Sequence, residues 1–258
     1  MTNSHPILEL VDVSINFGGI QAIDRLSFEV ENGHIFSLIG PNGAGKTTAI
    51  NMITGIYSPA EGEIYFEGQL VSGRKPYQVA RMGIARTFQN IQVFQNMTVR
   101  ENVMVGLHTR SRSEFLRCLL HTPMVRKEER MIRSRCDEVL EFMGLASKAD
   151  FLAANLSYGD QKRVEIARTL SAEPKLLLLD EPAAGLNSQE TQEISRTILM
   201  IREEGVTVLL VAHDMNLVMG ISDTIVVLNY GEKIADGKPA EIQNSDKVVS
   251  AYLGREPW

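Results

Sequence analysis

Cysteine is scarce in this sequence, and neither cysteine sits in a metal-binding pattern. Only Cys118 and Cys136 occur among 258 residues. They show neither the CxxC nor the Cys/His spacing that holds a structural zinc ion. We therefore expect two free thiols in a reducing compartment.

Long apolar runs are also missing. No stretch approaches the roughly 18 residues needed to cross a bilayer, and the longest, such as 206–212, suit buried strands. The N-terminus lacks a basic segment followed by an apolar one, so we expect no export signal. Internal repeats and low-complexity tracts are absent. The chain is expected to be cytosolic unless another protein holds it at a membrane.

Excess positive charge is absent from the chain as a whole. Lys and Arg number 26 against 32 Asp and Glu, a net charge of −6, which argues against broad nucleic-acid binding. Residues 108–135 are the exception, because eight Arg or Lys against three Glu leave this segment at +5. We expect a solvated helical face there; a surface that docks an acidic or membrane-embedded partner is the alternative.

Several segments have the pattern of buried parallel strands. Residues 34–40, 175–182 and 206–214 each contain a nearly continuous apolar run, as in strands covered on both faces. A helix predicted around 188–204 separates the last two, which makes a right-handed βαβ unit. With 44% hydrophobic residues the chain has ample core for an α/β domain.

Other parts of the chain differ from this parallel pattern. Short β segments precede residue 34, and a hairpin that turns at 229–231 is predicted within 223–237. Between 89 and 168 the periodicity is helical, with few β-branched clusters. We interpret 89–168 as an inserted helical subdomain.

A glycine-rich loop, "IGPNGAGKTT" at 39–48, joins one of these strands to a predicted helix at 46–54. Glycines let successive backbone N–H groups approach phosphate oxygens, and the helix N-terminus is positive. Lys46 should reach the β- and γ-phosphates, Thr47 should ligate Mg²⁺, and Thr48 should bind the α-phosphate. The alternative is a glycine-rich turn without a ligand. The strand and helix on either side favour a nucleoside triphosphate site, formed by Gly40, Pro41, Asn42, Gly43, Ala44, Gly45, Lys46, Thr47 and Thr48.

The strand in "LLLLDEP" ends in two carboxylates. Asp180 is expected at the carboxyl edge of the sheet, where ligands of open α/β sheets bind, and there it can hold Mg²⁺ through water. Glu181 lies one residue further and could take the proton from an attacking water. Alternatively, both carboxylates cap the next helix.

A third motif is "LSYGDQKRVEIAR" at 156–168. Ser157 suits the N-cap of a helix and Asp160 the N3 position, a carboxylate variant of the capping box. Ser157 and the Gly159 amide would form a second, exposed anion site; the alternative is only a well-capped amphipathic helix. The predicted packing residues of this helix are Val164, Ile166 and Ala167.

In order and spacing, these motifs and "VAHD" resemble the ATP-binding subunits of ABC transporters over nearly the whole chain. The resemblance implies an α/β P-loop NTPase (RecA-like) core with an antiparallel β subdomain and an inserted helical subdomain. Residues 1–258 would form one nucleotide-binding domain, with 89–168 as its helical insertion. ATP and Mg²⁺ are the implied ligands.

The resemblance also implies a head-to-tail dimer. Ser157 and Gly159 would contact the γ-phosphate held by the other copy. Gln89 matches a glutamine that touches Mg²⁺ or the attacking water, and His213 a histidine that contacts the γ-phosphate. Phe17 occupies the position where an aromatic ring stacks on adenine. The implied catalytic residues are Glu181, His213, Gln89 and Lys46, and the implied metal ligands are Thr47, Gln89 and Asp180.

Two positions depart from the family pattern. Asp160 stands where the signature has glutamine, and its charge is expected to weaken closure of the dimer around ATP, so that Asp160→Gln would strengthen dimerisation. Asn187 replaces a commoner aspartate and is expected to keep that residue's hydrogen bond to the other subunit without the charge.

Further details, including the 108–135 insertion, "PAAGLN" and the closing "AYLG", resemble the branched-chain amino-acid uptake group, in particular the longer of its two ATPase subunits. The implied partners are integral-membrane permeases, a second ATPase subunit (a paralogue or a second copy) and, indirectly, a periplasmic or extracellular solute-binding protein. The implied location is the cytoplasmic face of the membrane. Alternatives are a related urea or amide importer, a soluble nucleic-acid-associated clamp and a non-hydrolysing regulatory subunit; no nucleic acid is expected.

Overall fold

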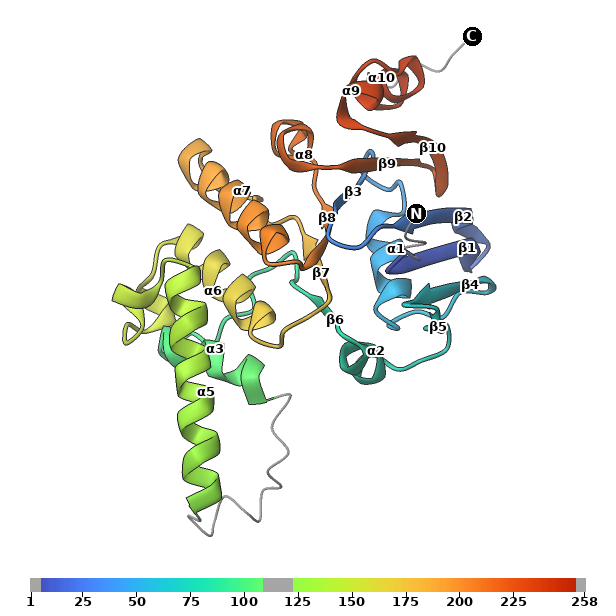
Figure 1. The fold of residues 1–258 in the computed structure, drawn as a ribbon. Coiled ribbons are helices and arrows are strands. Elements are labelled where there is room, and N and C mark those ends of the chain that lie inside the picture. Colours follow the sequence, from blue (N-terminus) through green and yellow to red (C-terminus); the bar gives the residue numbers. More distant parts are fainter. Residues whose placement is uncertain (1–5, 109–122, 254–258) are drawn as a thin grey trace, which may run out of the picture. The chain divides into compact units, whose positions relative to one another are not determined.

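The structure, a computed structural model, describes residues 6–108 and 123–253. The chain divides into two compact units. We call Met1–Arg86 with Lys175–Trp258 the core unit, and Thr87–Pro174 the helical unit. The elements of both are labelled in Figure 1.

A six-stranded sheet, in the order β10-β9-β3-β8-β7-β6, forms the base of the core unit. All neighbours are parallel except β10, which pairs antiparallel with β9. Every residue of β3, β7 and β8 is buried, as their continuous apolar runs predict. The strands are β3 (Ile35–Ile39), β6 (Ile84–Arg86), β7 (Leu176–Asp180), β8 (Thr207–Val211), β9 (Thr224–Asn229) and β10 (Glu232–Gly237).

A second, four-stranded sheet in the core unit is antiparallel, in the order β2-β1-β4-β5. It is built from β1 (Leu8–Phe17), β2 (Ile20–Val30), β4 (Glu61–Phe66) and β5 (Gln69–Leu70). Buried side chains of both sheets and of the helix after β3 form one hydrophobic cluster. Within it the rings of Phe28 and Phe36 stack with centroids 5.0 Å apart. The expected antiparallel β subdomain is therefore confirmed.

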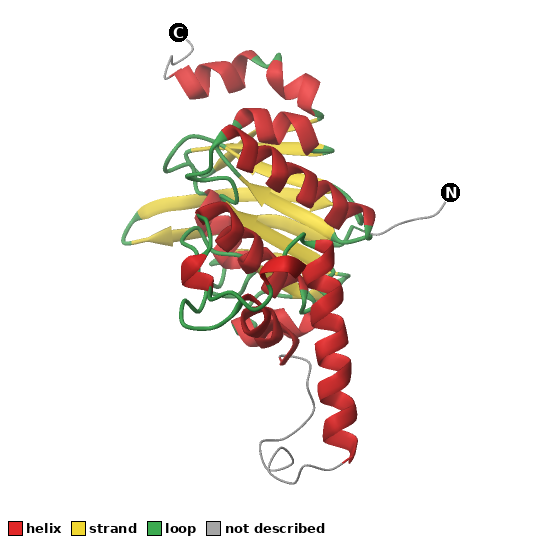
Figure 2. Cartoon of the chain, turned by 90° about the vertical axis from the view of Figure 1, so that its left-hand side faces the viewer, coloured by secondary structure: helices red, strands yellow, loops and turns green. Residues whose placement is uncertain are grey.

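Helices connect these strands (Figure 2). α7 links β7 to β8, as predicted, and the β9–β10 hairpin turns through Tyr230 and Gly231, both at positive φ. The helices of the core unit are α1 (Lys46–Ile53), α2 (Pro76–Met82), α7 (Ser188–Glu203), α8 (Met215–Ile221), α9 (Pro239–Gln243) and α10 (Asp246–Leu253).

The helical unit contains three helices and two short 3₁₀ turns within its described part. α6 packs on α3, and α3 on α5. The elements are α3 (Val99–His108), α5 (Pro123–Phe142), η1 (Ala146–Lys148), η2 (Ala153–Asn155) and α6 (Tyr158–Leu170). Much of the basic 108–135 segment lies outside the described residues, so its predicted role stays a prediction. No helix in the described ranges is long and apolar enough to cross a membrane.

Candidate functional site

The glycine loop joins β3 to α1 in the core unit. Gly40, Gly43 and Gly45 all have positive φ. A Cβ at Gly40 would lie 2.1 Å from the carbonyl oxygen of Leu228, and one at Gly45 would lie 2.7 Å from that of Ala22. Because neither backbone neighbour can yield easily, both positions require glycine.

Lys46 is the first residue of α1, and its side chain folds back over the loop. Nζ donates hydrogen bonds to the carbonyl oxygens of Gly40 at 2.7 Å and Pro41 at 2.9 Å. Burial lowers the pKa of Lys46, and the carboxylates of Glu181 and Asp180 act in the opposite direction. A half-buried ammonium group thus lies over the bare backbone of the loop.

Asp180 is the last residue of β7 and is buried at the carboxyl-terminal ends of the parallel strands. Its Oδ2 accepts from Arg86 Nη2 at 2.8 Å, and Arg86 Nη1 donates to Asn51 Oδ1 at 2.7 Å. The sequence motifs did not point to Arg86 or Asn51. Arg86 meets Asp180 because β6 pairs with β7, although the two residues are 94 positions apart in the sequence. Asn51, on α1, contacts Arg86.

Glu181 follows with the left-handed backbone conformation, at φ 52°. Its N–H donates to the carbonyl oxygen of Val211 at 2.8 Å, and its Oε2 lies 2.7 Å from His213 Nδ1. The carboxylates do not cap the next helix, because α7 is capped by Asn187. The helix-capping alternative is therefore wrong.

Asn187 uses its side-chain oxygen as the N-cap of α7. Oδ1 accepts from the backbone N–H groups of Gln189 at 2.9 Å and Glu190 at 3.0 Å. The Glu190 side chain completes a capping box by accepting from the Asn187 N–H. A hydrogen bond from Asn187 to another subunit stays a prediction.

The core unit also carries two aromatic residues to consider, the predicted Phe17 and Tyr252. Phe17 ends β1 with 43% of its surface exposed, and its ring meets that of Tyr57 edge-on at 5.1 Å. Tyr252 of α10 lies in the "AYLG" motif, but the motif does not single it out as a site residue. Burial raises the pKa of Tyr252, a hydrogen bond with the Gly40 backbone lowers it, and the charge of Glu181 raises it. The phenol therefore lies beside the glycine loop.

The helical unit carries the remaining predicted residues. Ser157 is the N-cap of α6 and accepts from the Asp160 N–H at 3.2 Å, as predicted. Ser157 is exposed, whereas Gly159 is buried. Gln89 is exposed in the segment between β6 and α3. The predicted packing residues Val164, Ile166 and Ala167 are buried.

The expectation for Asp160 needs correction. Its carboxylate does not complete a capping box, because it is bound by Lys148 and Arg163 and is buried. Burial alone would raise the pKa of Asp160, but the two cations outweigh this and hold the pKa below its usual range. The charge is thus compensated within the helical unit, which removes the reason for expecting repulsion of a phosphate.

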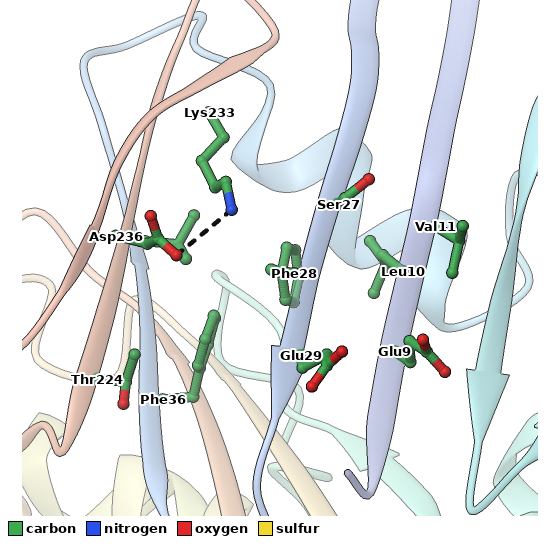
Figure 3. Close-up of a pocket in the computed structure, with 11 residues that line it drawn as sticks. Glu9, Leu10, Val11, Ser27, Phe28, Glu29, Phe36, Thr224, Lys233 and Asp236 are labelled. Carbon is green, nitrogen blue, oxygen red and sulfur yellow. Dashed lines mark hydrogen bonds and ion pairs between the residues drawn. The ribbon is translucent and has the colours of Figure 1, made fainter.

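A separate cleft of about 480 Å³ lies between the two sheets of the core unit (Figure 3). Leu10 and Phe28 line one wall of the cleft. Lys233 and Asp236 of β10 lie across from them, with Lys233 Nζ 3.4 Å from Asp236 Oδ2. It contains none of the predicted site residues.

The core unit therefore brings Lys46, Asp180, Glu181 and His213 together at the end of the parallel sheet that carries the glycine loop.

The family described as "ABC transporter" matches residues 23–184. The chain belongs to this family. The family described as "Branched-chain amino acid ATP-binding cassette transporter" matches residues 232–257.

Curated relatives cover almost the whole of this ABC protein. It is 45% identical to the high-affinity branched-chain amino acid transport ATP-binding protein BraF of Pseudomonas aeruginosa and to LivG of Escherichia coli K12. Each match covers 97% of this chain and 99% of the relative. A probable LivG of Archaeoglobus fulgidus is 38% identical over 97% of this chain. The predicted resemblance to the branched-chain amino-acid group is confirmed.

Solved ABC cassettes share the fold. One in its ADP conformation gives a TM-score of 0.85 at 34% identity, with 96% of this chain and 99% of that chain covered. A dimeric cassette bound to ADP and Pi gives 0.74 at 27% identity, with 90% and 98% covered. The predicted ABC ATPase fold and ATPase class are confirmed.

Proposed function

We propose that this chain is the ATP-hydrolysing subunit of a branched-chain amino-acid importer. The observation that carries the proposal is the Glu181–His213 pair beside the glycine loop of an ABC cassette. The names of the 45%-identical relatives support the substrate class. A urea or amide importer remains the alternative, since the solute pocket would lie on other chains.

The residues of the core unit suit a Mg²⁺-bound triphosphate. The glycine loop would cradle the phosphates, and the Lys46 ammonium would exchange two carbonyl partners for phosphate oxygens. Mg²⁺ keeps several waters and takes few protein ligands beside phosphates, which fits Thr47 and Asp180. Family resemblance adds Gln89 to this set. The metal would neutralise charge on the phosphates.

The proposed chemistry is in-line attack of water on the γ-phosphorus, in which the bond to the β–γ bridging oxygen breaks and ADP leaves with phosphate as the other product. Glu181 would take the proton from that water, and His213 would hold the Glu181 carboxylate and contact the γ-phosphate. Because phosphoryl transfer depends on positioning and charge stabilisation, both residues should affect kcat more than ATP binding.

The proposed assembly is a head-to-tail pair of ATPase subunits on the cytoplasmic face of the membrane. Ser157 and the Gly159 amide of one subunit would cap the nucleotide held by the other. The solved dimer of a related cassette supports pairing. The second subunit would be a paralogue or another copy, and permeases with a solute-binding protein would complete the importer. In this assembly 1–258 would be one nucleotide-binding domain, with 89–168, which lies within the helical unit, as its insertion.

The test is Glu181→Gln in the full chain. We expect hydrolysis to fall at least 100-fold, as expected for loss of a general base, while ATP binding stays within twofold. Lys46→Ala is the matched control and should lose binding as well. Hydrolysis by Glu181→Gln near the unmutated rate would refute the assignment. Reconstitution with the permease subunits and the solute-binding protein, followed by uptake of labelled leucine and urea, separates the two substrate classes.

A further inference from the structure

Besides Asp160, two charged side chains are almost completely buried on α6. Lys162 is 2% exposed and Glu165 is 1% exposed. Burying a charge is unfavourable unless it is paired and hydrogen-bonded. The two residues are three apart and so lie on the same face of the helix. Their contacts therefore need an explanation that packing alone does not give.

Both side chains bind the backbone around Gln89. Lys162 Nζ donates to the Gln89 carbonyl oxygen at 3.2 Å. Glu165 Oε1 accepts from the N–H groups of Phe88 and Gln92, each at 3.3 Å. The ammonium and the carboxylate thus hold the main chain on both sides of the Gln89 side chain, which stays exposed.

The same segment is held from α3. Asn102, which is fully buried, accepts from the Phe94 N–H at 2.8 Å and donates to the carbonyl oxygens of Phe94 at 3.1 Å and Thr98 at 2.9 Å. No helix or strand is assigned between β6 and α3. Side chains of two helices, rather than regular secondary structure, therefore fix the path of residues 88–98.

We propose that Lys162 and Glu165 are positioning residues that make the Gln89 segment and the Ser157 end of α6 move as one body. This inference rests on the proposed function. Ser157 caps α6 only five residues before Lys162, so one helix carries both groups. In the head-to-tail pair, Ser157 serves the nucleotide of the other subunit, whereas Gln89 serves its own.

Such a connection couples the two nucleotide sites. A change at Gln89 on loss of the γ-phosphate is passed through the buried pair to α6, and so to the cap of the opposite site. Hydrogen bonds between a charged group and the backbone are stronger than neutral ones. Such bonds therefore suit a connection that passes movement of the Gln89 segment to α6. Two neutral side chains would hold the segment less firmly.

The test compares Glu165→Leu with Glu165→Gln in the full chain. Leucine removes the carboxylate that accepts from the Phe88 and Gln92 N–H groups, whereas glutamine keeps an acceptor oxygen. We expect Glu165→Leu to lower kcat about tenfold with the KM for ATP unchanged within twofold, because the glycine loop belongs to the other unit. The Hill coefficient for ATP should fall toward one, and Glu165→Gln should restore most of kcat.

Ser171→Ala, at the C-cap of the same helix, is the matched control. Ser171 is fully buried, and its Oγ donates to the carbonyl oxygens of Val103 and Arg168 rather than to the Gln89 segment. It should lower the melting temperature without changing kcat or the Hill coefficient. If Glu165→Leu does not fold, Lys162→Met replaces it and carries the same expectation.

Two results would overturn the inference. One is a loss of kcat no greater than that of Ser171→Ala at an equal loss of melting temperature. The other is an unchanged Hill coefficient in both Glu165→Leu and Lys162→Met. Failure of the proposed function is a separate outcome, because it would appear as hydrolysis that does not depend on Glu181.

Discussion

His213 Nδ1 lies 2.7 Å from Glu181 Oε2, and the His213 backbone N–H donates to the same oxygen at 3.4 Å. The Glu181 backbone is fixed in turn by its hydrogen bond to Val211 and by its left-handed conformation. His213, which follows the neighbouring strand β8, thus orients the Glu181 carboxylate that is proposed to take the proton from water.

We predict that His213→Ala lowers kcat for ATP hydrolysis about 100-fold, the lower end of the range for a misplaced general base. The KM for ATP should change less than threefold, since Lys46 and the glycine loop are untouched. His213→Gln should retain part of the activity, because its amide N–H can still donate to Glu181. Steady-state kinetics of the three proteins measure this, and an unchanged kcat in His213→Ala contradicts the orienting role.

The buried Asp160 gives a prediction opposite to the one based on its charge alone. Lys148 and Arg163 already neutralise the carboxylate, so Asp160→Asn should not strengthen ATP-driven dimerisation. It should instead lower the free energy of unfolding by about 2 kcal/mol, the scale of hydrogen bonds to charged groups. Size-exclusion chromatography at matched ATP and urea denaturation measure both effects; a larger dimer fraction for the variant would restore the repulsion hypothesis.

The Asp160 effect should also depend on pH in a defined direction. The folded-state pKa of Asp160 is lowered, so its stabilisation is complete above the unfolded-state pKa of about 3.9 and is lost as pH falls through the folded-state pKa. The difference in stability between the unmutated chain and Asp160→Asn should therefore be constant near pH 7 and shrink in acid. Glu138→Gln, which breaks an exposed pair with Arg135, is the control and should change little.

The parts of the site that were foreseeable are local in sequence. The glycine loop, the two carboxylates at the end of β7 and the Ser157 cap each depend on residues a few positions apart, and each is where its motif places it. The motif alone therefore sufficed to locate them.

The ion pairs that the sequence motifs do not predict join segments that are distant in the sequence. Arg86 meets Asp180 only because β6 lies beside β7, and Lys148 reaches Asp160 from η1. Nothing in a motif specifies which cation neutralises a buried carboxylate, since strand order and loop path decide it. For this reason the sequence shows the Asp160 charge but not the two cations that bind it, and the effect of Asp160 on dimer closure stays a prediction.

Phe17 offers a test of nucleotide binding that leaves the chemistry untouched. Its ring is partly exposed at the end of β1 and supported edge-on by Tyr57. Because stacking of a base on an aromatic ring contributes about 1–3 kcal/mol, Phe17→Ala should raise the KM for ATP roughly tenfold and leave kcat within twofold. Stacking does not depend on base identity, so binding of GTP should weaken by a similar factor.

The control is Tyr57→Leu, which removes the supporting ring but keeps Phe17. It should raise the KM for ATP less than Phe17→Ala does, because the stacking face remains and only its orientation is freed. Titration with a fluorescent ATP analogue gives the same comparison without turnover. If Phe17→Ala binds ATP as tightly as the unmutated chain while Tyr57→Leu does not, the adenine lies against Tyr57, and the role proposed for Phe17 passes to that residue.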